Sequence, residues 1–237
     1  TAQDMNVKVP LISKIAYGFG DVGCNFSWMF VGNFLMIFYT DVCAIPMTAV
    51  SLLMLISRFW DAINDPIIGS LSDRTNTRWG RYRPWLLIGA PLTAIILVLT
   101  FWAHPNWSDG SKTVYMYVTY CLLVCGYTCV NIPYGILCGA LTQNIEERAQ
   151  INTSRSVCAM VAINIINIIT LPLIAAFGGG NQAQGYLLVT ILYGGIFTAC
   201  HWFCFAKTKE VVAPPVKERI PLGVQLKAVM RNKPYLI

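Results

Sequence analysis

Long apolar stretches dominate this chain, and short polar connectors separate them. A helix needs about 20 residues to cross the hydrocarbon core of a bilayer, and the stretches are of that length. They are too long and continuous to be the alternating strands of a membrane barrel. The pattern predicts six membrane-spanning α-helices, at Ile12–Tyr39, Met47–Gly69, Trp85–Ala103, Val114–Leu141, Val157–Phe177 and Tyr186–Phe205.

Residues 1–206 are therefore expected to form a six-helix bundle, and residues 207–237 a segment that follows it. Three prolines within Ala213–Leu222 are predicted to end the bundle. The stretch Gln225–Lys233 is typical of a basic amphipathic segment at the membrane surface. The final Pro-Tyr-Leu-Ile resembles the start of a seventh apolar helix, so we expect the chain to be the first half of a longer polypeptide.

Composition and charge exclude the soluble classes. Hydrophobic residues make up 56% of the chain and charged residues only 12%, whereas soluble domains carry about 25% charged residues. The net charge of +6 arises in the connectors, which indicates membrane topology rather than nucleic-acid binding. Under the positive-inside rule the N-terminus and the even-numbered connectors are cytoplasmic. Those connectors hold Arg74, Arg78, Arg81, Arg83, Arg148, Lys207, Lys209, Lys217 and Arg219.

Charged side chains inside the second stretch are the strongest functional signal, because a charge at a helix centre is costly in a membrane. Arg58, Asp61 and Asp65 share one face of this helix. The two aspartates repel each other at i,i+4 spacing, and they can share a proton, pair with Arg58 or bind a cation. Asn64 could add a carbonyl oxygen. A structural ion pair with Arg58 is the alternative to a cation site.

Polar residues also lie inside the first and fourth stretches. Asp21 and Asn25 are one turn apart in the first. In the fourth, Tyr127 and Asn131 share a face, and Thr128 lies beside them. An aromatic ring next to amides suits sugar binding, because rings pack on C–H faces and amides bond hydroxyls. Amides that bond a neighbouring helix are the alternative.

Arg155 follows a polar segment, Thr142–Ser154, and is expected to open the fifth helix. It is either a cytoplasmic anchor or a cavity residue that binds an anionic or hydroxyl-rich group. His104 and His201 look isolated, and we assign them no catalytic role. The nine cysteines contain no C-x-x-C pair and are interpreted as small hydrophobic residues. No nucleophile–base pair or phosphate loop is recognisable, so we expect no enzyme activity and no cofactor.

Several motifs resemble a known family. GSLSDRTNTRWGRYR, at residues 69–83, is similar to the cytoplasmic signature of major-facilitator transporters. WDAINDP at 60–66, RWGRYRPW at 78–85 and VNIPYG at 130–135 resemble the glycoside–pentoside–hexuronide:cation symporters. This resemblance implies twelve helices in two halves that rock around a central site. It also implies a bacterial inner membrane, a glycoside substrate and, by resemblance only, a cytoplasmic regulatory protein as a partner.

The resemblance implies roles for the polar residues. Asp61 and Asp65, with Asn64 and Thr128 near them, would bind the coupling ion, Na⁺ or H⁺, and the aspartates would be metal ligands only for Na⁺. A loop formed by Asp73, Arg74 and Arg81 would act as a cytoplasmic gate. The sugar site would consist of Asp21, Asn25, Tyr127, Asn131 and Arg155.

Departures from melibiose permeases bear on the substrate. Those permeases carry carboxylates where this chain has Asn25 and Asn131, so Arg155 is expected to lack local compensation. A net positive pocket suits an anionic sugar, and we expect a β-glucuronide or another hexuronide. A neutral pentoside or glucoside is the alternative within the family. The other classes considered are a membrane-embedded enzyme, a lipid carrier of the same superfamily and a structural subunit without transport.

Overall fold

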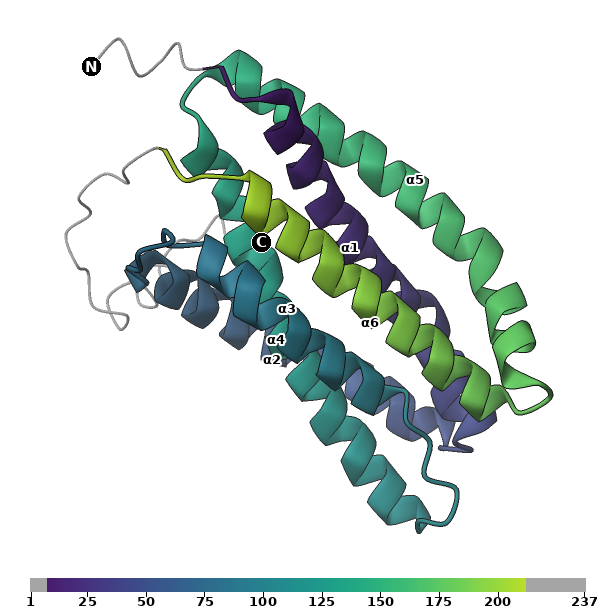
Figure 1. Ribbon diagram of the computed structural model, residues 1–237. Helices are drawn as coiled ribbons and strands as arrows, with labels where there is room; N and C mark the ends of the chain where they lie inside the picture. Colours follow the sequence, from purple (N-terminus) through teal and green to yellow (C-terminus); the bar gives the residue numbers. More distant parts are fainter. Residues whose placement is uncertain (1–7, 212–237) are drawn as a thin grey trace.

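Six long α-helices, joined by short connectors, make up nearly all of residues 8–211, the part of the chain that this computed structural model describes (Figure 1). A single π-helical turn, η2 (Phe38–Val42), continues the first helix. The α-helices are α1 (Leu11–Ile37), α2 (Met47–Arg74), α3 (Arg83–Thr100), α4 (Asp109–Leu141), α5 (Ile145–Gly178) and α6 (Gln182–Lys207).

The predicted spans are found as helices, and five of the six are long and apolar enough to cross a membrane. The exception is α2, which has 28 residues and lies at the predicted position. Arg58, Asp61 and Asp65 lie in the middle of α2 and lower its hydropathy below that of the other five. The least apolar of the six helices is thus the one that carries the predicted cation site.

Two connectors are shorter than the sequence suggests. The polar segment 142–154 was expected to be a loop, but α5 begins at Ile145, because the Asn144 side chain accepts hydrogen bonds from the backbone N–H groups of Glu146 and Glu147. The expectation that Arg155 opens the fifth helix is therefore wrong: it lies in the third turn. Residues 178–185 are also polar and Gly-rich, yet the connector there is only residues 179–181, where Gly179 has a φ of 52°.

Consecutive helices run antiparallel, so all connectors lie at one of two ends (Figure 1). The basic end contains the start of α1 and the connectors 75–82 and 142–144. The far end contains residues 38–46, 101–108 and 179–181. The rest of the predicted connecting segment, including Gln225–Lys233, lies outside the described residues.

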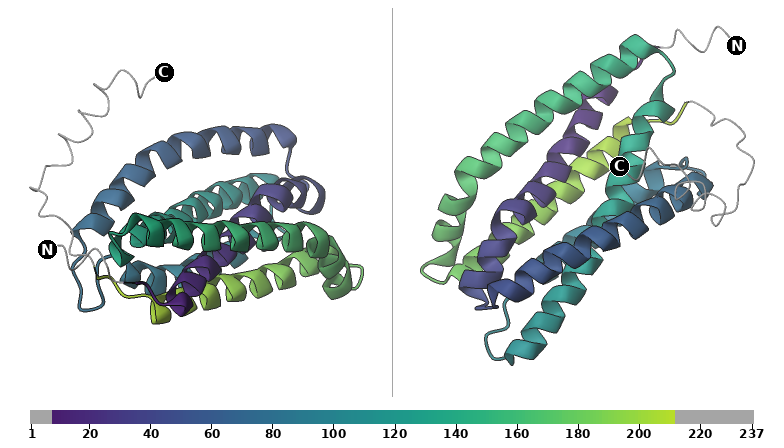
Figure 2. Two further views of the ribbon diagram at one scale, coloured as in Figure 1. Left: turned by 90° about the horizontal axis from the view of Figure 1, so that it is seen from above. Right: turned by 180° about the vertical axis from the view of Figure 1, so that it is seen from behind.

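The helices form two neighbouring groups (Figure 2). In one, α1 packs along α5 and α6; in the other, α3 and α2 pack on α4, and α3 joins the groups through α6. Buried aromatic side chains fill the interior toward the far end, among them Phe30, Phe38, Phe101, Tyr186 and Tyr193. α1 and α4 touch only where they cross, and this crossing carries the predicted sugar residues.

Candidate cation and sugar sites

Two stacked aromatic pairs join α1 to α4 where the helices cross. Toward the basic end, the rings of Tyr17 and Tyr134 stack with centroids 4.6 Å apart. Each hydroxyl donates to the other residue's backbone carbonyl, at 3.1 Å from Tyr17 and 2.5 Å from Tyr134. Toward the far end, Trp28 and Tyr127 stack at 4.4 Å. The residues between the two pairs form a polar layer, which has aromatic rings on both sides.

Asp21, Asn25 and Arg155 meet in this polar layer. The Arg155 Nε atom donates to Asp21 Oδ1 at 2.8 Å, and Asn25 Nδ2 donates to Asp21 Oδ2 at 3.2 Å. The Asp21 side chain is 9% exposed and that of Arg155 is 39% exposed. The guanidinium also lies 5.6 Å from the Tyr134 ring centroid. The structure thus brings together three residues that the sequence assigned to sugar binding.

The expectation that Arg155 lacks local compensation is wrong. Asp21 is a full counter-charge in direct contact with it, so the pair has no net charge. The pocket is therefore not net positive, which removes the main reason to expect an anionic sugar. The pairing was not visible in the sequence, because 134 residues separate the two side chains.

Cys24 contacts both Asn131 and His201 in this layer. Cys24 Sγ lies 3.9 Å from Asn131 Oδ1 and 3.5 Å from His201 Nε2. His201 Nδ1 is 2.7 Å from the carbonyl oxygen of Phe197. Because a carbonyl only accepts, Nδ1 carries the ring proton and Nε2 is left to accept from the thiol. His201 is fully buried and is not isolated, contrary to the expectation.

The predicted cation residues lie on α2, where Asp65 is exposed, and on α4, where Thr128 contacts Asp65. Thr128 donates to Asp65 Oδ1 at 3.3 Å, and Asp61 is half-buried one turn before Asp65 on α2. Asn64 is 6% exposed, and its Nδ2 atom makes no hydrogen bond in the described part of the chain. These oxygen donors fit a small hard cation or a proton.

The alternative that the sequence left open is a structural ion pair with Arg58. Across residues 8–211, no ion pair joins Arg58 to either aspartate. The same residues contain no group of three or more His, Cys, Asp or Glu side chains that could hold a metal ion. A sodium ion would therefore need the hydroxyl of Thr128 or the amide of Asn64 in addition to the carboxylates.

The predicted gate residues lie at the basic end. The Arg81 guanidinium donates to the Asp73 backbone carbonyl at 3.2 Å, and the Tyr82 hydroxyl donates to the Asp73 carboxylate at 2.9 Å. Burial and this hydrogen bond raise the pKa of Tyr82 to about 12. Asp73 and Arg81 are thus together as expected, whereas Arg74 is exposed at the end of α2.

Glu210 is a member of this cluster that the sequence did not reveal. Its carboxylate accepts from the backbone N–H groups of Arg81 and Tyr82, each at 2.8 Å, and of Arg83 at 3.1 Å. An anion is stabilised at a helix start because the N–H groups there lack helical partners. Gly80 makes the turn possible: its φ is 110°, and an added Cβ would lie 2.5 Å from Glu210.

Comparison with known proteins identifies the family. The model of the MFS/sugar transport protein family matches residues 16–237. The chain belongs to this family. The expected resemblance to major-facilitator glycoside:cation symporters is confirmed, and so is the expectation that the chain is not an enzyme, because the family and its members are transporters.

Individual relatives agree with this assignment. The isoprimeverose transporter of Lactiplantibacillus pentosus is 40% identical over 97% of this chain and 48% of its own length. A putative glycoside/cation symporter of Escherichia coli, YagG, is 37% identical over 94% of the chain and 48% of its own length. The E. coli glucuronide carrier protein homolog is 34% identical over 98% and 51%. The chain therefore spans about half the length of these relatives.

Proposed function

We propose that the chain forms the first half of a cation-coupled glycoside symporter, whose basic end faces the cytoplasm of a bacterium. One observation supports this most strongly. The Thr128–Asp65 hydrogen bond connects the carboxylate pair of α2 to the helix that carries Tyr127 and Asn131. A change at the cation residues is thereby transmitted to the sugar layer by one rigid element, α4.

The proposed coupling is reciprocal. Na⁺ or H⁺ at Asp61 and Asp65 removes the repulsion between them and strengthens the contact of α2 with Thr128. That contact holds α4, and with it Asn131, in the position that binds sugar. Because coupling free energies are symmetric, bound sugar strengthens cation binding by the same factor.

The polar layer suits an uncharged glycoside. Amide, thiol and hydroxyl groups can bond sugar hydroxyls, and the rings of Trp28 and Tyr127 can pack on sugar C–H faces. Arg155 is already paired with Asp21, so a sugar carboxylate would have to displace Asp21 to reach it. The relationship to an isoprimeverose transporter supports this preference. A glucuronide is the second candidate, supported by the relationship to a glucuronide carrier homolog and by the part of Arg155 that is exposed.

Uptake by the full-length protein in proteoliposomes tests the proposal. With an inward Na⁺ or H⁺ gradient, labelled isoprimeverose should accumulate above its external concentration, and glucuronides should compete poorly. Asp65→Asn should abolish gradient-driven accumulation, while exchange of internal for external sugar continues. The matched control is Asp41→Asn, which changes an exposed acid at the far end. Full accumulation in the Asp65 variant would contradict the cation assignment.

The basic-end cluster is proposed as the gate. Asp73, Arg81 and Glu210 connect the end of α2, the start of α3 and the segment after α6. Opening the cytoplasmic side would require these elements to separate. The cluster would therefore stabilise the arrangement in which that side is closed, and Arg74 would face solvent in that arrangement.

A further inference from the structure

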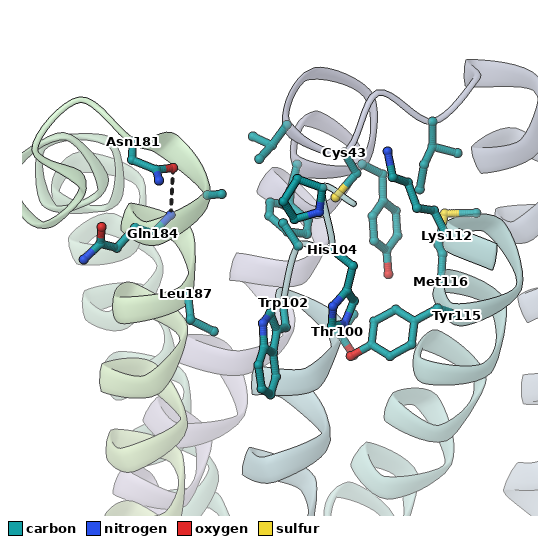
Figure 3. A pocket seen from close by; sticks show the side chains of 17 residues that line it. Cys43, Thr100, Trp102, His104, Lys112, Tyr115, Met116, Asn181, Gln184 and Leu187 are labelled. Atoms are coloured by element: carbon teal, nitrogen blue, oxygen red, sulfur yellow. Dashed lines mark hydrogen bonds between the residues drawn. The ribbon is translucent and has the colours of Figure 1, made fainter. Parts of the chain in front are cut away.

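A cavity lies at the far end of the bundle and shares no residue with the sites above. Its volume is about 390 Å³, within the usual range of small-molecule pockets. Its walls come from η2, the end of α3, the start of α4 and the start of α6. Figure 3 shows Asn181, Gln184 and Leu187 on one side, Lys112, Tyr115 and Met116 on the other, and Trp102 and His104 between them.

Stacked rings make up the wall between those two sides. The His104 ring stacks on Trp102 at 5.5 Å between centroids, and on Trp107, which does not line the cavity, at 4.1 Å. Tyr115 meets His104 edge-on at 4.8 Å, and its hydroxyl donates to the Leu99 carbonyl at 2.7 Å. Rings held in this way present a rigid surface for a flat apolar face.

Polar groups with unused hydrogen-bonding capacity surround the rings. Among the described residues, the Asn181 side chain uses only its oxygen, which accepts from the Gln184 backbone N–H at 3.4 Å and caps α6. For the Lys112 ammonium, the one carboxylate within 4 Å in residues 8–211 is Asp109, at 3.8 Å, which is beyond hydrogen-bond distance. Several donors are thus free to meet a ligand.

Tyr39 adds a buried donor to the same cavity. It is 2% exposed, and no hydrogen bond of good geometry reaches its hydroxyl within the described residues. The Thr119 hydroxyl lies close to it and itself donates to the Tyr115 carbonyl at 2.8 Å. A buried hydroxyl without a hydrogen bond costs free energy, which a polar ligand would recover.

We propose that this cavity is a peripheral glycoside-binding site, which captures the sugar before it enters the central polar layer. Aromatic faces, amide donors and one ammonium group are the combination that recognises a hydroxylated ring. An acyl chain would use only the apolar walls and would leave the donors unpaired. The inference rests on the proposed function, because a capture site is useful at the end from which a glycoside is imported.

Cys43 lines the cavity and can report its occupancy. The other eight cysteines lie on the membrane helices, and all nine are free thiols. Burial raises the pKa of Cys43 to about 11, against the opposing charge of Lys112. Labelling with a membrane-impermeant maleimide should therefore be run at about pH 9, where more thiolate is present. The full-length protein in proteoliposomes, free of alkyl glycoside detergents, is the sample, and Cys43→Ser identifies the signal.

Isoprimeverose should slow the labelling of Cys43 at least fivefold, and mannitol at equal osmolarity should not. Protection should persist in Arg155→Gln, which disables the central layer, and this excludes an indirect effect of central binding. Gln184→Ala should weaken protection, while the matched variant Gln182→Ala, outside the cavity in the same helical turn, should retain it. Protection by a lysophospholipid but not by sugar would overturn the inference.

Two results separate this inference from the proposed function. If sugar accumulates with the cation gradient but never protects Cys43, or protects it only while Arg155 is intact, the peripheral site is refuted and symport stands. If Cys43 is protected but no gradient drives uptake, the peripheral site is supported and the proposed symport is refuted.

Discussion

Replacing Asp21 with Asn should shift the sugar preference of this protein toward anionic glycosides. The substitution preserves the shape of the side chain and an acceptor for Asn25, but it removes the counter-charge that Arg155 contacts at 2.8 Å. The guanidinium then becomes available to a carboxylate on the ligand. A hydrogen bond between charged groups contributes about 1.5–3 kcal/mol.

That free energy corresponds to about ten- to a hundredfold in relative affinity, at about 1.4 kcal/mol per factor of ten. The Arg155 side chain is 39% exposed, so solvent screening favours the lower limit. We therefore expect the affinity ratio of a glucuronide to isoprimeverose to rise about tenfold in Asp21→Asn. Arg155→Gln should instead weaken both sugars and destabilise the protein, because it leaves the buried Asp21 carboxylate without its cation.

The assay is competition against labelled isoprimeverose in proteoliposomes, scored as inhibition constants for a glucuronide and for an uncharged glycoside. Asp41→Asn, an exposed carboxylate at the far end, is the matched control and should leave the ratio unchanged. The reasoning is refuted if the ratio in Asp21→Asn equals that of the unmodified protein. It is equally refuted if the unmodified protein already prefers the glucuronide.

Three further predictions concern single side chains. Thr128→Val removes the 3.3 Å hydrogen bond to Asp65 and should raise the cation concentration for half-maximal uptake about tenfold. Thr128→Ser should restore the original concentration, and an unchanged value in Thr128→Val would contradict the coupling. Glu210→Gln weakens the anionic cap on three backbone N–H groups. It should lower the free energy of unfolding by about 0.5–2 kcal/mol, measured as a lower thermal midpoint. The control Glu146→Gln, at an exposed side chain, should leave the midpoint unchanged. Tyr134→Phe keeps the ring stacking but loses the hydroxyl donor, so we expect a stability loss of about 1 kcal/mol. If stability does not fall, the stacking alone joins Tyr17 to residue 134.

Much of the fold could be predicted from the sequence, because membrane helices follow from local hydropathy. Helix positions, their antiparallel order and the unusual polarity of α2 all appear in runs of neighbouring residues. Helix ends were less predictable. The polar segment 142–154 looks like a loop, yet the cap at Asn144 starts α5 within it, because a capped polar sequence can be as helical as an apolar one.

The site was predicted as a set of residues, not as a set of contacts. The sequence by itself indicated that polar side chains lie inside apolar helices, where lipid cannot satisfy them, and so selected Asp21, Asp65 and Asn131. It placed Arg155 at the start of the fifth helix. Only the tertiary structure decided that Arg155 is neutralised by Asp21, which is 134 residues away. The physical reason is that hydropathy is a local property of residues adjacent in the chain, whereas an ion pair between helices depends on how those helices pack and face each other.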